Sequence, residues 1–599
     1  MSNTNQSFTP VIYSIQELLS LSLVDFGMAL AKQFEERKGE RPDREEKVKW
    51  LKTYELLQKV LPTFKEIPAE LVFGYELPGE EGRSPDLILL IENQLLVIEI
   101  QSTHETRKGE QIESTHYLRD LQAYHTASGE LEITSLRILA DAKKAQRSVN
   151  GIEQLTDAGF KSYLSSLFKR YKESPIVSAD TWAKASYQAL PDLREAAKTL
   201  FEQQELPVME KAKEAKLPET MRFLKETIVS VANAKKHQLI FLTGAPGTGK
   251  TVAGLQLAQT LDNPLYLTAN TAFAEVIQET TSQYFVQNLH QFLSENSTVN
   301  TPVIIVDEAQ RVWDTSTVSA QGGAEQSEAS ALLSIGAKNT WSIIVCLVGE
   351  GQEIYLGEEK GLSLWEEALE SSSTQWDVLV PPHWESRFTY PHQIDPLLHL
   401  TTSMRTHLAN DLQAWVDALL EGDLALCATL SDQLNQKGFH IDLTRRMSVA
   451  KQHIQHIYSK AKEKRYGILS TSHDRLLQET DLTLTEDIAA FYNTSPADTH
   501  SCCQLKEYVT EFECQGLDLD YTMVCWGDDL VWNGDRWIEL YHRKEADQSI
   551  RLRKNAYRVL LSRARDGMML YVPEGLALDK TYEVLKEAVG ATPCGRPKK

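Results

Sequence analysis

The spacing of apolar residues changes twice in the first part of the chain. Residues 10–65 carry apolar positions at helical spacing. Short apolar runs bounded by turn residues follow at 71–78, 86–91 and 95–101, and these runs predict strands. Helical spacing returns at 118–125. This part is therefore predicted to be an α/β domain.

Longer apolar runs mark the rest of the chain. The runs at 239–243, 302–306 and 341–348 are almost wholly apolar, and a helical pattern follows the first. Strands buried on both faces read in this way in parallel sheets. The fold class predicted for the whole chain is α/β, with parallel sheets after residue 226.

The stretch 239–258 reads LIFLTGAPGTGKTVAGLQLA, an apolar strand, a glycine-rich loop and a helix. Glycines let the loop backbone approach an anion, and the amides of the next helix can then bind phosphates. Lys250 would reach the β- and γ-phosphates, and the Thr251 hydroxyl would ligate Mg²⁺. The residues expected to bind the nucleotide here are Gly244, Gly247, Thr248, Gly249, Lys250 and Thr251.

A second part of a phosphoryl-transfer site follows the apolar run 302–306, as Asp307-Glu308-Ala-Gln-Arg. Asp307 would hold Mg²⁺ through water, and Glu308 would orient or deprotonate the attacking water. ATP and Mg²⁺ are therefore the expected cofactors.

The order of these motifs resembles the superfamily 1 helicase motor over about the last three fifths of the chain. In that resemblance Gln352 follows a strand as a γ-phosphate sensor, and Arg405 matches the motif IV arginine. Gln515 and Gly516 begin a motif V-like sequence. The resemblance implies two RecA-like P-loop domains with ATP bound between them.

The last motif, Ser562-Arg563-Ala-Arg565, resembles motif VI. It implies that Arg563 acts as an arginine finger from across the cleft. Arg565 is expected to be a solvated helix charge. Two stretches, 348–365 and 555–573, look like bacterial proteins related to the helicase domain of Schlafen proteins. That branch implies a nuclease-like domain in front of the motor, and a role in anti-phage defence or DNA processing.

The predicted hairpin 86–101 carries the second chemical signal. Glu99 and Gln101 point to one face because side chains alternate along a strand, and a carboxylate in the run LLVIEI is costly without a cation. The pattern resembles the PD-(D/E)XK nuclease fold. Asp86 and Glu99 would then bind Mg²⁺ or Mn²⁺, and Gln101 stands where that superfamily has its catalytic lysine. Gln122 or Glu46 could complete the site.

Three alternatives stay open. The two acids could be structural and paired with Arg83 or Arg107. The chain could be an ATP-gated nucleic-acid sensor that unwinds nothing, which Gln101 favours. It could also be a Schlafen-like nuclease directed at RNA.

The predicted domains are a PD-(D/E)XK-like domain at 1–175 and a helical linker at 176–225. A first RecA-like domain follows at 226–400 and a second at 401–599.

Composition limits the kinds of partner and the cellular compartment that we expect for this protein. The 599 residues carry a formal net charge of −22, so a nucleic-acid groove would have to be locally basic. The seven cysteines form no CxxC pair, which indicates reduced thiols. No apolar run is long enough to span a bilayer, and the N-terminal residues do not read as a secretory signal. We expect a cytoplasmic protein that binds nucleic acid, DNA rather than RNA, with its oligomeric state open.

Overall fold

The structure is a computed structural model, and two compact units make it up. The first unit contains Met1–Ala189 with Gln433–His440 and Lys451–Lys464, and the second contains the rest. The described residues are 9–77, 84–101, 108–140, 142, 152–188, 192–203, 216–244, 247–261, 263–281, 285–295, 301–322, 325–349, 361–401, 408–459, 464–477, 480–540 and 546–590.

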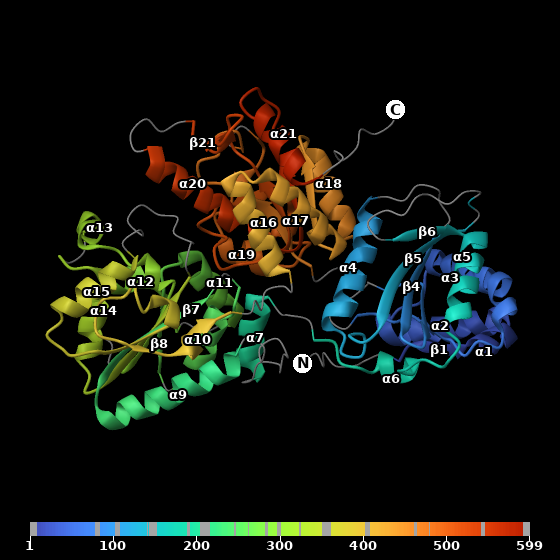
Figure 1. The fold of residues 1–599 in the computed structure, drawn as a ribbon, viewed down its shortest axis with the longest axis horizontal. Coiled ribbons are helices and arrows are strands. Elements are labelled where there is room, and N and C mark those ends of the chain that lie inside the picture. The colour runs from blue at the N-terminus through green and yellow to red at the C-terminus, as the bar shows by residue number, and fades with distance from the viewer. Residues whose placement is uncertain are drawn as a thin grey trace. The chain divides into compact units, whose positions relative to one another are not determined.

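The first unit is built on a mixed sheet in the order β1-β2-β3-β4-β5-β6 (Figure 1). Neighbours from β1 to β4 are antiparallel, whereas β4, β5 and β6 run parallel. The strands are β1 Val11–Ser14, β2 Glu70–Phe73, β3 Leu87–Ile91, β4 Gln94–Gln101, β5 Glu132–Leu139 and β6 Glu153–Thr156. The helices are α1 Ile15–Ser20, α2 Leu23–Lys38, α3 Arg44–Val60, η1 Leu61–Phe64, α4 Lys108–Tyr124, α5 Asp157–Arg170 and α6 Ala179–Ala183.

Helices cover both faces of this sheet because its strands are apolar on both sides. One core joins α1, α2, α3, η1 and α5 to the face that carries Leu87, Leu89 and Ile98. The other core joins α4 and α6 to the face that carries Ile88 and Val97. The unit is therefore a three-layer α/β domain.

The second unit contains two parallel sheets. The first has the order β13-β12-β7-β11-β10-β8-β9, and β14 also pairs with β7. Its strands are β7 His237–Gly244, β8 Leu265–Thr268, β9 Val286–Asn288, β10 Val303–Asp307, β11 Ser342–Val348, β12 Asp377–Val380, β13 Gln393–Ile394 and β14 His399–Leu400. Its helices are α7 Leu193–Gln203, α9 Leu217–Ala234, α10 Lys250–Gln259, α11 Thr271–Thr281, α12 Leu289–Ser294, η2 Ala309–Arg311, α13 Thr315–Ala320, α14 Glu328–Ala337, α15 Gly361–Ser371, η4 Pro382–Trp384 and η5 Pro396–Leu398.

The second sheet of this unit has the order β15-β22-β19-β16-β18-β17. Its strands are β15 His440–Thr444, β16 Tyr466–Leu469, β17 Thr483–Leu484, β18 Glu507–Val509, β19 Leu519–Cys525 and β22 Ala564–Tyr571; β20 Val531–Trp532 and β21 Trp537–Ile538 form a separate hairpin. The helices are α16 Ala409–Glu421, α19 Ile488–Asn493, η7 Cys502–Gln504, α20 Ala546–Leu561 and α21 Asp579–Ala588. Helices α17 Leu424–Gln436 and α18 Met447–Ile457 are divided between the two units.

The predicted α/β fold class is confirmed, and the predicted strands at 86–91, 95–101, 302–306 and 341–348 are present. One expectation is wrong: Arg565 lies on strand β22, because α20 ends at Leu561 and the apolar run that follows pairs with β19. The predicted domain boundaries stay a prediction.

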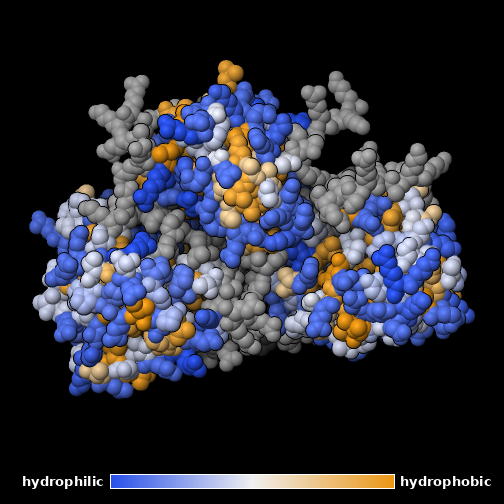
Figure 2. All heavy atoms as spheres, viewed as in Figure 1, coloured by the Kyte–Doolittle hydropathy of each residue, from blue (hydrophilic) through white to orange (hydrophobic). Residues whose placement is uncertain are grey.

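The surface is mainly hydrophilic. On the face drawn in Figure 2, hydrophilic side chains dominate, and apolar residues gather in separate small groups. Of the helices that the structure describes, none combines the length and the apolar character that crossing a bilayer requires.

Candidate functional sites

The glycine-rich loop joins β7 to α10 in the second unit. Gly247 and Gly249 have φ values of 79° and 91°, which residues with a side chain rarely adopt. Lys250, the first residue of α10, is buried and its Nζ donates to the Gly244 carbonyl at 2.7 Å. The loop backbone and the start of α10 thus form the strand–loop–helix that the sequence predicts. Residues 245 and 246 are outside the described residues.

Two of the predicted magnesium ligands are in contact. The Thr251 hydroxyl donates to the Asp307 carboxylate, and Tyr266 Oη donates to Asp307 Oδ2 at 2.9 Å. Burial, and then the neighbouring Glu308 carboxylate, raise the pKa of Asp307 to about 7. A carboxylate in such a place is stabilised by a cation. Thr251 and Asp307 therefore fit Mg²⁺.

Glu308 follows Asp307 in a left-handed conformation, with φ of 54°. Gln310 Nε2 donates to Glu308 Oε2, and Gln310 Oε1 accepts from the Gly349 amide at 3.1 Å. The sequence interpretation gave Gln310 no role. In the structure it ties the predicted water-orienting carboxylate to the residue after β11.

Two predicted residues of the motor lie outside the described residues, namely Gln352 and Arg405. Arg563 is described and buried, between α20 and β22. Its guanidinium donates to the Val559 carbonyl at 3.0 Å and to Ser562 Oγ at 2.9 Å. Neither of these two hydrogen bonds connects Arg563 with the described residues of the glycine-rich loop.

The Gln515-Gly516 segment is linked to the first sheet of the same unit. Arg311 Nη1 donates to Gln515 Oε1 at 2.7 Å, and Asn270 Nδ2 donates to the Gln515 carbonyl at 2.5 Å. All three side chains are buried. Gly516 has φ of 79° and allows the chain to turn there. Neither Arg311 nor Asn270 was predicted to make this link, although Arg311 stands in the motif that begins at Asp307.

The two acids of the first unit meet at one edge of the mixed sheet. β3 and β4 pair with Leu87 opposite Ile98, so the same register places Asp86 opposite Glu99. Asp86 Oδ2 accepts from the Ile100 amide at 2.6 Å. Glu99 and Gln101 are both half-buried and share a face of β4, as predicted.

Each acid has a basic partner. Lys49 Nζ lies 2.5 Å from Asp86 Oδ1, and Arg137 Nη2 lies 3.2 Å from Glu99 Oε2. Asp86 first, and then its hydrogen bond and the carboxylates of Glu46 and Glu99, raise the pKa of Lys49 well above its ordinary value against the effect of burial. Both basic partners differ from the expected Arg83 and Arg107, which lie outside the described residues.

Asp86 and Glu99 still fit a hard divalent cation, because they present carboxylate oxygens at one sheet edge. Of the two residues proposed to complete the site, Glu46 lies close enough to Lys49 to contribute to the raised pKa of its ammonium group. Gln122 is exposed on α4. Across the described part of the chain, no three His, Cys, Asp or Glu side chains are placed as a metal cluster. A Mg²⁺ ion would therefore complete its shell with water and substrate phosphate.

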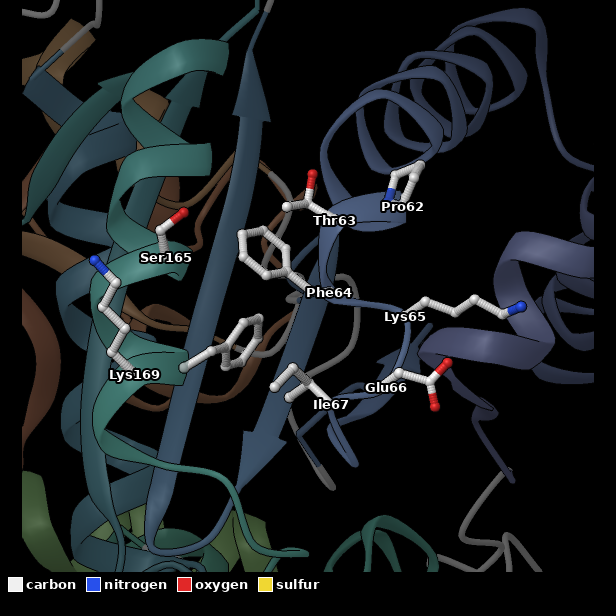
Figure 3. Close-up of a pocket in the computed structure, with 9 residues that line it drawn as sticks. Pro62, Thr63, Phe64, Lys65, Glu66, Ile67, Ser165 and Lys169 are labelled. Carbon is white, nitrogen blue, oxygen red and sulfur yellow. The ribbon is translucent and has the colours of Figure 1, made fainter.

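A separate pocket lies between η1 and α5 (Figure 3). Phe64 and Phe168 form its apolar wall and belong to the core, with ring centroids 5.1 Å apart. Lys65 and Lys169 point to opposite sides of it. The two cations do not converge, so we assign no phosphate site to this pocket.

Comparison with protein families decides what the second unit is. The family model for Schlafen group 3, DNA/RNA helicase domain, matches residues 237–574, more than half of the chain. The chain belongs to the Schlafen group 3 helicase family. The matched residues begin at β7 and end just after β22, so the helicase motor includes both parallel sheets.

Solved helicase structures are also similar. A Pif1 helicase from Bacteroides, in complex with ADP-AlF3 and ssDNA, is 11% identical with a TM-score of 0.29; the match covers 61% of this chain and 97% of that one. A Pif1 structure described for unwinding at forked dsDNA is 12% identical with a TM-score of 0.28, over 62% and 98%. The DUF1998 helicase MrfA bound to DNA is 11% identical with a TM-score of 0.28, over 68% and 52%. No curated protein sequence matches the chain.

Proposed function

We propose that the motor hydrolyses ATP and uses the hydrolysis to move along a nucleic-acid strand, DNA in the first place. The observation that carries this proposal is the contact of Thr251 with Asp307. Lys250 directly precedes Thr251 on α10, and Glu308 directly follows Asp307. Thr251 and Asp307 would hold Mg²⁺, which neutralises charge on the β- and γ-phosphates. Lys250 would bind those phosphates, and Glu308, held by Gln310, would orient the attacking water.

The remaining motif residues would act on the same nucleotide. Arg563 would stabilise the charge that develops on the γ-phosphate from across the cleft, Arg405 would act as the motif IV arginine, and Gln352 would sense the γ-phosphate. Gln515 and Gly516 would report nucleotide state through Arg311. Opening and closing of the two sheets would then advance the strand. Contacts with the strand would be to phosphates and by stacking, with little reading of sequence.

The test of the ATPase is Lys250→Ala. We expect this variant to lose ATP turnover, because the loop loses the charge that binds the phosphates. Lys236→Ala is the matched control, since Lys236 lies at the entry to β7 and pairs on the surface with Asp377 at 2.8 Å. Equal ATP turnover in Lys250→Ala and wild type would contradict the assignment.

We further propose that the first unit is a metal-dependent nuclease with Asp86 and Glu99 at its centre. Their placement across adjacent strands supports this proposal. When bound, Mg²⁺ or Mn²⁺ would activate water and bind the scissile phosphate. Asp86 would be fixed by the Ile100 amide, and Glu99 by Arg137. The domain limits predicted from the sequence are part of this proposal, as is a role in anti-phage defence or DNA processing.

A cleavage assay separates the nuclease from its two alternatives. Single-stranded DNA, double-stranded DNA and RNA are each incubated with Mg²⁺ or Mn²⁺, using wild type and Asp86→Asn. DNA cleavage that Asp86→Asn abolishes is expected. Cleavage of RNA alone favours the RNA-directed nuclease. If nothing is cut, the ATP-gated sensor is favoured, in agreement with the basic partner of each acid.

A further inference from the structure

Helix α3 places Lys49 beside the acid pair of the first unit, Asp86 and Glu99. Lys49 Nζ lies 2.5 Å from Asp86 Oδ1, and the other Asp86 oxygen accepts from the Ile100 amide. Asp86 is therefore held between the β4 backbone and an ammonium group. The sequence interpretation did not include Lys49.

The helical repeat explains why this lysine arrives there. Thr53, Leu56 and Val60 are buried on one face of α3, and Lys49 lies on that face one turn earlier. Leu56 and Val60 pack in the core beneath β3 and β4. The Lys49 ammonium group reaches Asp86 at the end of the sheet where β3 begins and β4 ends.

Apart from Lys49, the described residues at this end of the sheet offer a substrate phosphate no accessible positive charge. Gln101 shares the face of Glu99 but is neutral. Arg137 is fully buried, so it can fix Glu99 without contacting a substrate. The Lys49 side chain is 38% exposed, whereas that of Asp86 is 5% exposed. Of the cations described at this edge, Lys49 is thus the one that a phosphate can approach.

We propose that Lys49 is the catalytic cation of this site. It would take the role of the lysine that the PD-(D/E)XK superfamily has at the position of Gln101. The inference rests on the proposed nuclease function. In the reaction, water adds to phosphorus, the bond from phosphorus to the leaving sugar oxygen breaks, and a proton from water ends on that oxygen. The products are a phosphomonoester and an alcohol. Lys49 stays protonated and donates to a non-bridging phosphate oxygen on which negative charge develops.

The experiment compares full-length wild type, Asp86→Asn, Lys49→Met, Lys49→Gln and Lys49→Arg. Lys59→Met is the matched control, because Lys59 lies on the same helix and pairs with Asp157 at 2.7 Å, away from the acids. Cleavage of a single-stranded DNA oligonucleotide is measured with Mn²⁺. The two neutral variants should cut about 100-fold more slowly or worse, as when one transition-state donor is removed. Lys49→Arg should recover part of the rate, and Lys59→Met should match wild type.

A second measurement separates catalysis from folding. Mn²⁺ affinity is measured by calorimetry without nucleic acid, with Asp86→Asn as the reference for this site. Removing the ammonium frees Asp86, so Lys49→Met or Lys49→Gln should bind Mn²⁺ more tightly while cutting more slowly. A disordered site would lose both properties. ATP turnover reports on the integrity of the second unit in each variant.

The outcomes are distinct. If wild type cuts, Asp86→Asn does not, and either folded neutral variant of Lys49 cuts at the wild-type rate, the assignment of Lys49 is overturned and the nuclease stands. If wild type cuts no DNA or RNA, both proposals fail. If the neutral variants lose cleavage and bind Mn²⁺ more weakly, Lys49 only holds the site together, and the catalytic assignment fails.

Discussion

The backbone at residue 244 leaves no room for a side chain. A Cβ atom there would lie 2.4 Å from Thr248 Oγ1 and 2.7 Å from the Leu400 carbonyl. Gly244→Ala should therefore shift the glycine-rich loop, lower stability by about 1–3 kcal/mol and reduce ATP turnover by about 100-fold. Phosphate release and thermal unfolding measure the two effects.

Gly27 provides the control for this change. It lies inside α2, and a Cβ there would meet nothing within 4 Å. Gly27→Ala should leave ATP turnover unchanged and stabilise the first unit by about 0.5–1 kcal/mol, because alanine loses less backbone entropy in a helix. A Gly244→Ala variant that behaves like Gly27→Ala would show that the loop tolerates the extra atom.

His125 makes the stability of the first unit depend on pH. Its side chain is 2% exposed, Nδ1 is bonded to Ser128 Oγ at 2.7 Å, and burial lowers its pKa to about 4. At pH values below the ordinary histidine pKa of about 6.5, His125 binds a proton in the unfolded chain but stays neutral in the folded one. The contribution of neutral His125 to the free energy of unfolding is therefore complete above that pH and is lost as the pH falls toward 4.

His125→Asn should keep the bond to Ser128 and remove the titration. Hydrogen exchange of peptides from α4 and α6, measured between pH 7.5 and 4.5, tests this. Relative to the variant, wild type should lose about 2–3 kcal/mol of opening free energy over that range. A difference that does not change with pH would mean that His125 is not buried in its neutral form.

The sequence predicts residues that stand in a local motif better than residues that arrive from elsewhere. Thr251 and Asp307 could be assigned to one magnesium site from the sequence, because each belongs to a motif that follows an apolar strand and the two motifs occur in the expected order. Lys49 is far from Asp86 in the sequence, and only the packing of α3 on the sheet brings it there. Gln310 was visible in its motif, but its bond to the Gly349 amide depends on where β11 ends.

At the scale of elements, Gln515 connects the segment after β18 with the segments after β8 and β10. Its side chain accepts from Arg311 and its carbonyl accepts from Asn270, all without exposure to solvent. Such a buried bond to a charged donor contributes about 1.5–3 kcal/mol. In the proposed function, this bond would help to transmit nucleotide state.

A double-mutant cycle with Arg311→Met and Gln515→Leu measures that link. The coupling in the free energy of unfolding should be about 1–3 kcal/mol, because the two side chains contact each other directly. The single variants should also weaken the stimulation of ATP turnover by nucleic acid. Additive effects within 0.5 kcal/mol, roughly the scatter of independent sites, would argue against the link.

Strand prediction succeeded where an apolar run is bounded by turn residues, as for β3, β4 and β10. It failed at Arg565, because the helical pattern of α20 runs directly into the strand without a proline or a long turn. In the structure Arg565 lies near the carboxylates of Asp192 and Glu195 and helps to stabilise their charge. Pairing with β19 decides the conformation there, and pairing is not visible in a single segment.

At the scale of the whole molecule, the two proposed phosphate chemistries belong to two different compact units. Asp86→Asn should therefore abolish cleavage and leave ATP turnover in the absence of nucleic acid unchanged. Lys250→Ala should abolish ATP turnover without changing Mn²⁺ binding at Asp86. Loss of both activities in either variant would show that the two sites are not independent.

The family match establishes a helicase motor, and the central claim is that ATP hydrolysis drives movement on nucleic acid. The most direct measurement is the steady-state ATP turnover of wild type as single-stranded DNA is added. The account predicts that turnover rises with DNA to a plateau and that Lys250→Ala shows no turnover at any DNA concentration. A rate that neither DNA nor RNA changes would contradict it.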